Sequence, residues 1–269
     1  MKGSDELPAY AKITLKPFGS VVHADAIEYL KNVEDNSIDL IVTDPPYKCI
    51  SGGKNGKKGR PSGILSKNDG KIFKHNDVKP EIWFPELYRV LKEGSHCYIM
   101  TNTLNLREYL NLAEKVGFKL HNLLVWEKNN KVTNRWYMKN GEYVLFLRKG
   151  PAKPINDCSC ATIHQFDNVR KKEHPTEKPV SLLKMYVTNS SQEGDTVLDP
   201  FCGSGSLAEA CLLSNRKFIC IDIDEEFYQK TTNRVLTCIK QLPDEMRYKY
   251  ERSTEKHCEN HENNIFWFD

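Results

Sequence analysis

The sequence predicts an α/β protein built on a doubly wound, mostly parallel β-sheet with one antiparallel edge hairpin. Short apolar, β-branched runs alternate with segments of helical periodicity along most of the 269 residues. Strands that are apolar on both faces belong in a parallel sheet covered by helices on both sides. The chemically distinctive residues follow directly after strands, at the sheet edge where ligands of such folds bind.

Composition and length describe a folded globular chain. Of its residues, 39 % are hydrophobic and 28 % charged, which is too apolar for a disordered protein, and we expect a single domain over residues 1–269. The longest apolar runs, such as Tyr143–Leu147, fall far short of the roughly 20 residues that span a bilayer. No apolar stretch follows the start of the chain, so we expect no secretory signal, no membrane partner and a cytoplasmic location.

Cysteine usage argues against a disulfide framework and against a metal site. The nine cysteines are an odd number, and Cys97 and Cys220 lie in apolar stretches where a thiol packs as a small hydrophobe. The cluster Cys158-Ser159-Cys160 with His164 lacks the two-residue spacer and the second ligand pair of usual zinc sites. We therefore expect ordinary thiols and no metal.

Charge is unevenly distributed along the chain. The formal net charge is only +3, but residues 48–79 carry +7 and residues 127–173 carry +5, so that the remainder carries −9. Such concentration is typical of a polyanion binder, and it is equally compatible with two solvated loops. Charge alone leaves both interpretations open.

Strands are expected where apolar β-branched residues run without interruption. The clearest run, Ile38–Thr43, stops at two prolines, which lack the amide hydrogen that a central strand needs. In chain order, the expected strands are Ser20–His23, Ile38–Thr43, His96–Thr101, Leu120–Trp126, Glu142–Leu147, Thr196–Leu198 and Lys217–Ile221.

Helices are expected where apolar residues recur every three or four positions. Trp83, Leu87 and Leu91 share one face of such a segment, with Gly94 as its expected cap, and Gly117 ends the next helix. In chain order, the expected helices are Asp25–Lys31, Glu81–Leu91, Leu106–Val116, Pro179 to about Ser190, Ser206–Leu213 and Glu225 to about Leu242.

Three segments have no clear period. Residues 48–79 contain six glycines and many lysines and are expected to form a long, mobile, basic loop, which is uncommon in a compact domain unless it is functional. Residues 150–173 are expected to be an inserted or variable segment. The polar tail at 243–269 has no assigned role.

The glycine-rich segment after the strand at 196–198 suggests a nucleoside cofactor site. A strand, a Gly-x-Gly turn at Gly203 and Gly205 and a helix start are expected to let a ligand approach the backbone closely, with free amide groups pointing at it. Asp222 ends the next strand, where it is placed to accept hydrogen bonds from two ribose hydroxyls. The pattern does not separate NAD from S-adenosylmethionine, and an ordinary tight turn is the simpler alternative.

The second distinctive segment is Asp44-Pro45-Pro46-Tyr47. Two prolines hold it almost rigidly and remove its amide hydrogens, so it presents acceptors: the Asp44 carboxylate and the Pro45 carbonyl. Tyr47 adds a flat aromatic face. A planar exocyclic amine needs this arrangement, because it has two hydrogens to donate and a ring to stack. The alternative is a proline-rich strand exit without chemistry.

Together these segments resemble the amino-directed DNA methyltransferases, in the group whose Asp-Pro-Pro-Tyr segment precedes the cofactor glycine turn. The resemblance runs from about Val21 to Val235 and includes "VVHADAIEYLKNVEDNSIDLIVTDPPY", "LLVWEKNN", "GEYVLFLRKG", "HPTEKPVSLLKMYV" and "GDTVLDPFCGSGSLAEACLLSNRKFICIDID". It implies the methyltransferase type of the predicted sheet and Asp44, Pro45, Pro46 and Tyr47 as the catalytic segment. It further implies an S-adenosylmethionine site lined by Asp25, Lys178, Pro179, Asp199, Phe201, Gly203, Ser204, Gly205 and Asp222.

The resemblance also implies a substrate and partners. Asp at the first position of the Asp44–Tyr47 segment is similar to the pattern of the adenine-N6 enzymes, whereas Ser is more usual there in the cytosine-N4 enzymes. The resemblance therefore favours methylation of adenine in double-stranded DNA, after the adenine has been flipped out of the helix. Lys54, Lys57, Lys58 and Arg60 are expected to contact DNA phosphates. A second copy of the chain and a cognate restriction endonuclease are further partners that the resemblance leaves open.

Departures from the family pattern and rival functions remain. Ser206 replaces the frequent Thr, Cys220 replaces the usual Gly, and the expected target-recognition segment, 150–173, is short. Either specificity for a DNA sequence is low, or residues 48–79 and 128–141 share the recognition of that sequence.

Three kinds of alternative function remain. The first is a methyltransferase that acts on cytosine-N4, RNA or a protein amide. The second is an NAD-dependent oxidoreductase, which leaves the Asp44–Tyr47 segment unexplained, and the third is a catalytically silent DNA-binding relative, which the intact segment argues against.

Overall fold

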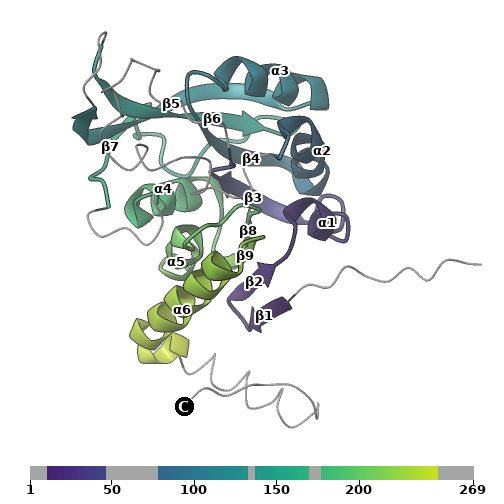
Figure 1. Ribbon diagram of the computed structural model, residues 1–269, viewed down its shortest axis with the longest axis vertical. Coiled ribbons are helices and arrows are strands. Elements are labelled where there is room, and N and C mark those ends of the chain that lie inside the picture. Colours follow the sequence, from purple (N-terminus) through teal and green to yellow (C-terminus); the bar gives the residue numbers. More distant parts are fainter. Residues whose placement is uncertain (1–10, 47–77, 133–136, 170–176, 248–269) are drawn as a thin grey trace, which may run out of the picture.

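A computed structural model describes residues 11–46, 78–132, 137–169 and 177–247, and these form one mixed sheet flanked by helices (Figure 1). The strands are β1 (Ala11–Leu15), β2 (Gly19–His23), β3 (Ile38–Thr43), β4 (Leu91–Thr101), β5 (Lys119–Val132), β6 (Lys139–Arg148), β7 (Ile163–Gln165), β8 (Thr196–Asp199) and β9 (Lys217–Asp222). The helices are α1 (Ala26–Leu30), α2 (Pro80–Val90), α3 (Leu106–Val116), α4 (Val180–Ser190), α5 (Ser206–Leu212) and α6 (Glu225–Gln241).

The sheet order is β1-β2-β9-β8-β3-β4-β6-β5-β7. The five strands from β2 to β4 run parallel to one another, which confirms the predicted α/β class with a mostly parallel sheet. Antiparallel pairing occurs in two hairpins where one was expected: β1–β2 lies at an edge, whereas β5–β6 is internal because β7 pairs outside β5. β6 also joins the parallel part by antiparallel pairing with β4.

Each face of the sheet has its own hydrophobic core. Helices α4, α5 and α6 cover one face, and their buried side chains pack with Leu40, Tyr98 and Val197 of the strands. Helices α1, α2 and α3 cover the other face, where Trp83 and Leu87 of α2 pack with strand residues of the opposite pleat. A doubly covered sheet leaves its strand ends as the open positions for ligands.

Several elements differ from the sequence-based expectation. Gly94 does not cap a helix: α2 ends at Val90, β4 begins at Leu91, and Gly94 lies inside that strand, where its amide donates to the Lys149 carbonyl at 2.8 Å. The short strands β1 and β7 were not expected, because β1 carries polar residues at an edge and β7 has only three residues. In the part of the chain that the structure describes, no helix is long and apolar enough to cross a membrane.

Candidate functional site

The two distinctive segments meet at the carboxyl edge of the sheet. β3 and β8 are parallel neighbours, with Leu40 opposite Val197, so the residues that follow the two strands emerge side by side. A hydrogen bond joins the strand ends directly: the Thr43 hydroxyl donates to Asp199 Oδ1 at 2.7 Å, across 156 positions of the chain. The predicted catalytic and cofactor segments therefore form one site.

Asp44, directly after β3, is held by a buried cation. Lys178 Nζ, just before α4, donates to Asp44 Oδ2, while Asp44 Oδ1 is buried without a hydrogen-bond partner among the described residues. Burial raises the pKa of Asp44 above its ordinary value, and the Lys178 ammonium offsets part of that rise. The next residue, Pro45, is buried, and Pro46 is half-buried.

A second carboxylate shares the same lysine. Glu142 Oε2 on β6 lies 3.4 Å from Lys178 Nζ, and Glu142 Oε1 accepts from Lys128 Nζ on β5. Burial opposes the ionisation of Glu142, but the two lysines together hold its pKa below the usual value. A row of four alternating charges therefore runs from the β5–β6 hairpin to the end of β3. We call this row the charge chain; it consists of Lys128, Glu142, Lys178 and Asp44.

Asp199 ends β8 and is fixed by two donors. Its Oδ1 accepts from the Thr43 hydroxyl at 2.7 Å and from the Phe201 amide at 3.1 Å. Burial raises the pKa of Asp199 to about 7, and the nearby carboxylates of Asp44 and Asp222 raise it further while the two donors lower it. Three carboxyl groups thus lie at this edge, and their mutual repulsion contributes to the raised pKa of Asp199.

The glycine turn is closed by its own hydrogen bonds, contrary to the expectation of free amide groups. The Gly203 amide donates to Asp222 Oδ2 at 2.9 Å, the Cys202 amide to the Ile221 carbonyl at 3.0 Å and the Gly205 amide to the Cys202 carbonyl at 3.0 Å. These donors, with that of Phe201, are already used. At these four positions the turn therefore offers no unpaired amide to a ligand.

Gly205 serves helix packing. Its φ is +78°, and a Cβ built on it would lie 2.7 Å from Cγ2 of Thr231 on α6. The glycine is thus needed both for its left-handed backbone and for the close approach of α5 to α6. Its expected place in the cofactor site stays a prediction beside this packing role.

Asp222 and Asp25 are positioned by backbone amides. Asp222 accepts from Gly203 and, through Oδ1, from the Asp224 amide at 2.9 Å, so its carboxylate is fixed at the end of β9. Asp25 caps α1, with Oδ1 accepting from the amides of Ile27 and Glu28 at 2.8 and 3.1 Å. Both lie beyond neighbouring strands, since β2 pairs with β9 and His23 lies opposite Asp222.

An ion pair ties the start of α4 to the glycine turn. Arg234 on α6 contacts Glu177 at 2.6 Å and donates to the Ser204 carbonyl at 2.9 Å. Glu177 is followed directly by Lys178 and Pro179, so this short connection is anchored to the cofactor segment on one side and to Asp44 on the other. The connection couples the two halves of the site mechanically.

The described residues bring most of the expected site together. Tyr47, Lys54, Lys57, Lys58 and Arg60 lie outside the described residues. Sequence reasoning missed Thr43, Lys128, Glu142, Glu177 and Arg234. A signal existed for Glu142, since a carboxylate stands directly before the apolar run Tyr143–Leu147; we find none for Arg234, one of several charged residues on an amphipathic helix.

Comparisons with known proteins agree on one family. A sequence profile described as DNA methylase, covering N6- and N4-methyltransferases, matches residues 38–233. The chain is 32 % identical over 242 residues to the type II methyltransferase M.HpaI of Haemophilus parainfluenzae, covering 80 % of this chain and 73 % of that protein. It is 29 % identical over 253 residues to the DNA adenine methyltransferase YhdJ of Escherichia coli K12, covering 80 % and 82 %. Among solved structures, the M1.HpyAVI–SAM complex matches with a TM-score of 0.60 and 25 % identity, covering 79 % of this chain and 97 % of that one.

Proposed function

Starting from the fact that this chain belongs to the N6/N4 amino-methyltransferase family of DNA methylases, we propose that it methylates the exocyclic N6 amine of adenine at specific sites in double-stranded DNA, with S-adenosylmethionine as the methyl donor. Adenine is supported by the named activity of the relative YhdJ and by Asp at position 44. Cytosine-N4 methylation is the second candidate, because the family includes both reactions.

The observation that carries this proposal is one buried oxygen of Asp44. A buried acceptor without a donor costs about 1–3 kcal/mol, and Asp44 Oδ1 has no hydrogen-bond partner within the described part of the chain, while the bond from Lys178 to Oδ2 fixes the carboxylate in place. An arriving N–H donor would remove that cost. The Pro45 carbonyl is proposed as the acceptor for the second amine hydrogen.

Asp44 and Pro45 would act on the electronic state of the target amine. The lone pair of an exocyclic amine is delocalised into the base and attacks poorly. Accepting both hydrogens favours a pyramidal nitrogen and stabilises the positive charge that grows on it, which is electrostatic stabilisation combined with positioning. Tyr47 is proposed to stack on the base after flipping, which offsets an unstacking cost of a few kcal/mol.

The residues around the glycine turn suit a cationic ligand. When bound, S-adenosylmethionine supplies an activated methyl group on a positively charged sulfur. The carboxyl groups of Asp44, Asp199 and Asp222 lie where such a ligand is expected, and a cation bound there would favour their ionised forms. We propose that Asp222 binds the ribose, Asp25 approaches the adenine, and Phe201, Gly203, Ser204, Gly205, Lys178 and Pro179 complete the wall of the site.

DNA is proposed to lie along the carboxyl edge of the sheet. The basic segment 48–79, with Lys54, Lys57, Lys58 and Arg60, would contact phosphates, and residues 150–173 and 128–141 would share the recognition of sequence. We propose one methyltransferase domain over residues 1–269, a cytoplasmic location and, from the type II naming of the relative M.HpaI, a cognate restriction endonuclease as a partner.

Methylation mapping at base resolution tests the proposal. DNA incubated with the protein and S-adenosylmethionine should gain N6-methyladenine at one short recurring sequence, and the Asp44→Ala variant should produce none. N4-methylcytosine at such a sequence would replace the adenine assignment by the second candidate. Binding of NAD without binding of S-adenosylmethionine, or no methyl transfer to any DNA, would overturn the proposal.

A further inference from the structure

We propose that Glu142 is a positioning residue of the methyl-transfer site: through its ion pair with Lys178 it offsets the charge of that ammonium beside Asp44, and so helps to stabilise the cation that forms on the target amine. This inference rests on the proposed function and adds to it a residue outside the Asp44–Tyr47 segment and the glycine turn.

The contacts of the charge chain carry the first step. Lys178 Nζ lies between two carboxylates, bonded to Asp44 Oδ2 and 3.4 Å from Glu142 Oε2. Its side chain is 5 % exposed, and those of Asp44 and Glu142 are 20 % and 22 % exposed. Water therefore screens these charges weakly, and a change in one of them is felt by the others.

The count of charges carries the second step. With Asp44 and Lys178 alone, a carboxylate and an ammonium cancel, and a cation forming at Asp44 would meet a neutral pair. Glu142 adds a second negative charge on the far side of the lysine; with Lys128 the four groups are neutral, and without Glu142 they would carry +1. Lys128 lies one residue further along the charge chain and compensates Glu142 only at a greater distance from Asp44.

The unpartnered atoms carry the third step. Asp44 Oδ1 and Glu142 Oε2 are both buried without a hydrogen-bond partner among the described residues, on either side of the same ammonium. Here Lys178 bonds one carboxylate and only approaches the other, which lets it lean toward Glu142 when the amine donates to Asp44.

The reaction makes the need for this charge explicit. The nitrogen lone pair forms the new N–C bond, the S–C bond breaks, and its electron pair stays on sulfur as a neutral thioether. The positive charge thereby moves from sulfur to nitrogen beside Asp44, and is discharged when the nitrogen loses a proton to the solvent through the Asp44 carboxylate. An environment that is negative at that moment lowers the barrier.

Single-turnover and steady-state kinetics of Glu142→Gln test the inference. We expect the methyl-transfer rate and kcat to fall about 10- to 100-fold, the effect of one unit charge several ångströms away at an intermediate effective dielectric constant. The KM values for DNA and S-adenosylmethionine should stay within about twofold. Glu142→Asp, which keeps the charge, should restore most of the rate, and this second variant separates charge from packing.

Glu127→Gln provides a matched control on the same hairpin. Glu127 on β5 accepts from Asn140 at 3.0 Å and from Gln165 at 2.8 Å and makes no ion pair with Lys178, so its loss should change kcat less than twofold. A kcat of Glu142→Gln equal to that of the unaltered protein, or equal losses in Glu142→Gln and Glu142→Asp, would overturn the inference. If the unaltered protein itself methylates no DNA, the proposed function fails instead, and the two failures are distinct.

Discussion

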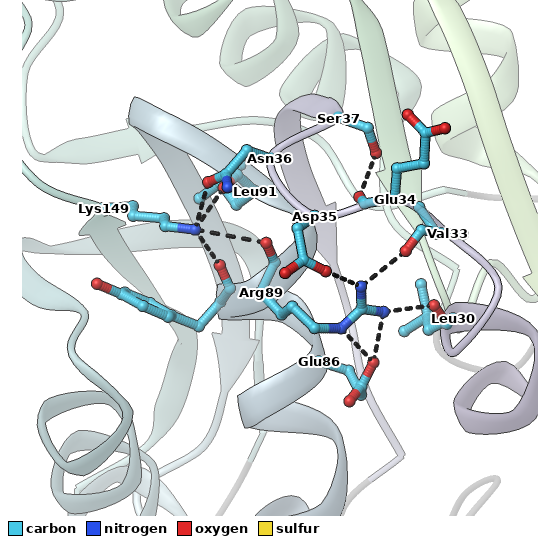
Figure 2. A network of polar contacts seen from close by, with 11 residues as sticks. Leu30, Val33, Glu34, Asp35, Asn36, Ser37, Glu86, Arg89, Leu91 and Lys149 are labelled. Carbon is cyan, nitrogen blue, oxygen red and sulfur yellow. Dashed lines mark hydrogen bonds and ion pairs between the residues drawn. The ribbon is translucent and has the colours of Figure 1, made fainter.

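Two lysines, each only 5 % exposed, lie at opposite ends of the central parallel strands and have different kinds of hydrogen-bond partner. Lys149 follows β6 at the edge away from the site and donates to neutral oxygens: Asn36 Oδ1 and the carbonyls of Tyr88 and Leu91, each at 2.8 Å (Figure 2). Lys178 lies between the carboxylates of Asp44 and Glu142. Among the described residues, the second network leaves Asp44 Oδ1 without a hydrogen-bond partner and holds Glu142 Oε2 only by its ion pair with Lys178 at 3.4 Å.

The pKa directions express the same difference. Burial lowers the pKa of Lys149, and the carboxylates of Glu93 and Asp35 offset only part of that effect. Burial also opposes the charge of Lys178, but the carboxylates of Asp44 and Glu142 outweigh it and raise the pKa of that ammonium. A buried ammonium whose donors are all used by neutral oxygens stabilises a loop. An ammonium that lies between two carboxylates instead fixes those carboxylates in position while part of their capacity to accept hydrogen bonds is still available to a substrate.

The largest expected effect comes from Lys178→Met. Without the ammonium, burial raises the pKa of Asp44 further, so the carboxylate takes a proton at neutral pH and kcat falls by about 100-fold or more. Because only ionised Asp44 accepts the amine hydrogen, kcat should recover as the pH is raised through the new pKa. The groups that face Asp44 in the described residues are Glu142, Lys128, Tyr109 and Asp199, and Lys178 is the one that bonds it.

Measurement of kcat from pH 6 to pH 9 checks this prediction. The ratio of unaltered to variant kcat should shrink steadily with pH. A ratio that is constant across the range would mean that Lys178 does not control the ionisation of Asp44.

Lys149→Met should act on stability instead of activity. Removing the ammonium takes the charged donor from Asn36 Oδ1 and from the carbonyls of Tyr88 and Leu91, which should lower the free energy of unfolding by about 3 kcal/mol. The kcat per folded molecule should be unchanged, because the residue lies at the other end of the sheet. Urea unfolding combined with active-site titration measures both quantities, and a loss of kcat without a loss of stability would break the comparison.

Gly205→Ala, measured by urea unfolding, tests whether this glycine of the cofactor segment is needed for packing between α5 and α6. The added Cβ would meet Thr231 Cγ2 at 2.7 Å at a φ of +78°, and we expect about 2 kcal/mol of destabilisation. Thr231→Ser in the same chain removes the methyl group and should restore part of the stability. If the double variant is no more stable than Gly205→Ala, backbone strain alone accounts for the loss.

The smallest effect is expected at the exposed rim of the polar network that contains Lys149 and Arg89 (Figure 2). Arg89 donates to the carbonyls of Leu30 and Val33 and pairs with Glu86, and Asp35 is its most exposed partner, with 66 % of the side chain accessible (Figure 2). Asp35→Ala should therefore change the free energy of unfolding by less than about 0.5 kcal/mol. A loss above 2 kcal/mol in urea unfolding would show that Asp35 is essential to the network.

Prediction from the sequence worked best where structure is local. The apolar run Ile38–Thr43 is β3 with the same bounds, and the helix Leu106–Val116 ends at Gly117 with a φ of +107° as its pattern indicates. It failed where pairing decides: β7 is a three-residue strand that exists because β5 offers an edge, and Gly94 looked like a helix cap but lies in a strand that begins at Leu91. Local propensity is weaker than the hydrogen bonds of a long ladder.

The sequence by itself determined the order of the strands and helices other than β1 and β7, the two segments that end β3 and β8, and the family to which they belong, because each depends on residues that are neighbours in the chain. Only the tertiary structure decided that Lys128, Glu142, Lys178 and Asp44 form one charge chain and that the amides of Phe201, Cys202, Gly203 and Gly205 are already bonded. Those contacts join strands and helices through parallel pairing and crossovers, and no local periodicity records which charges such pairing buries together.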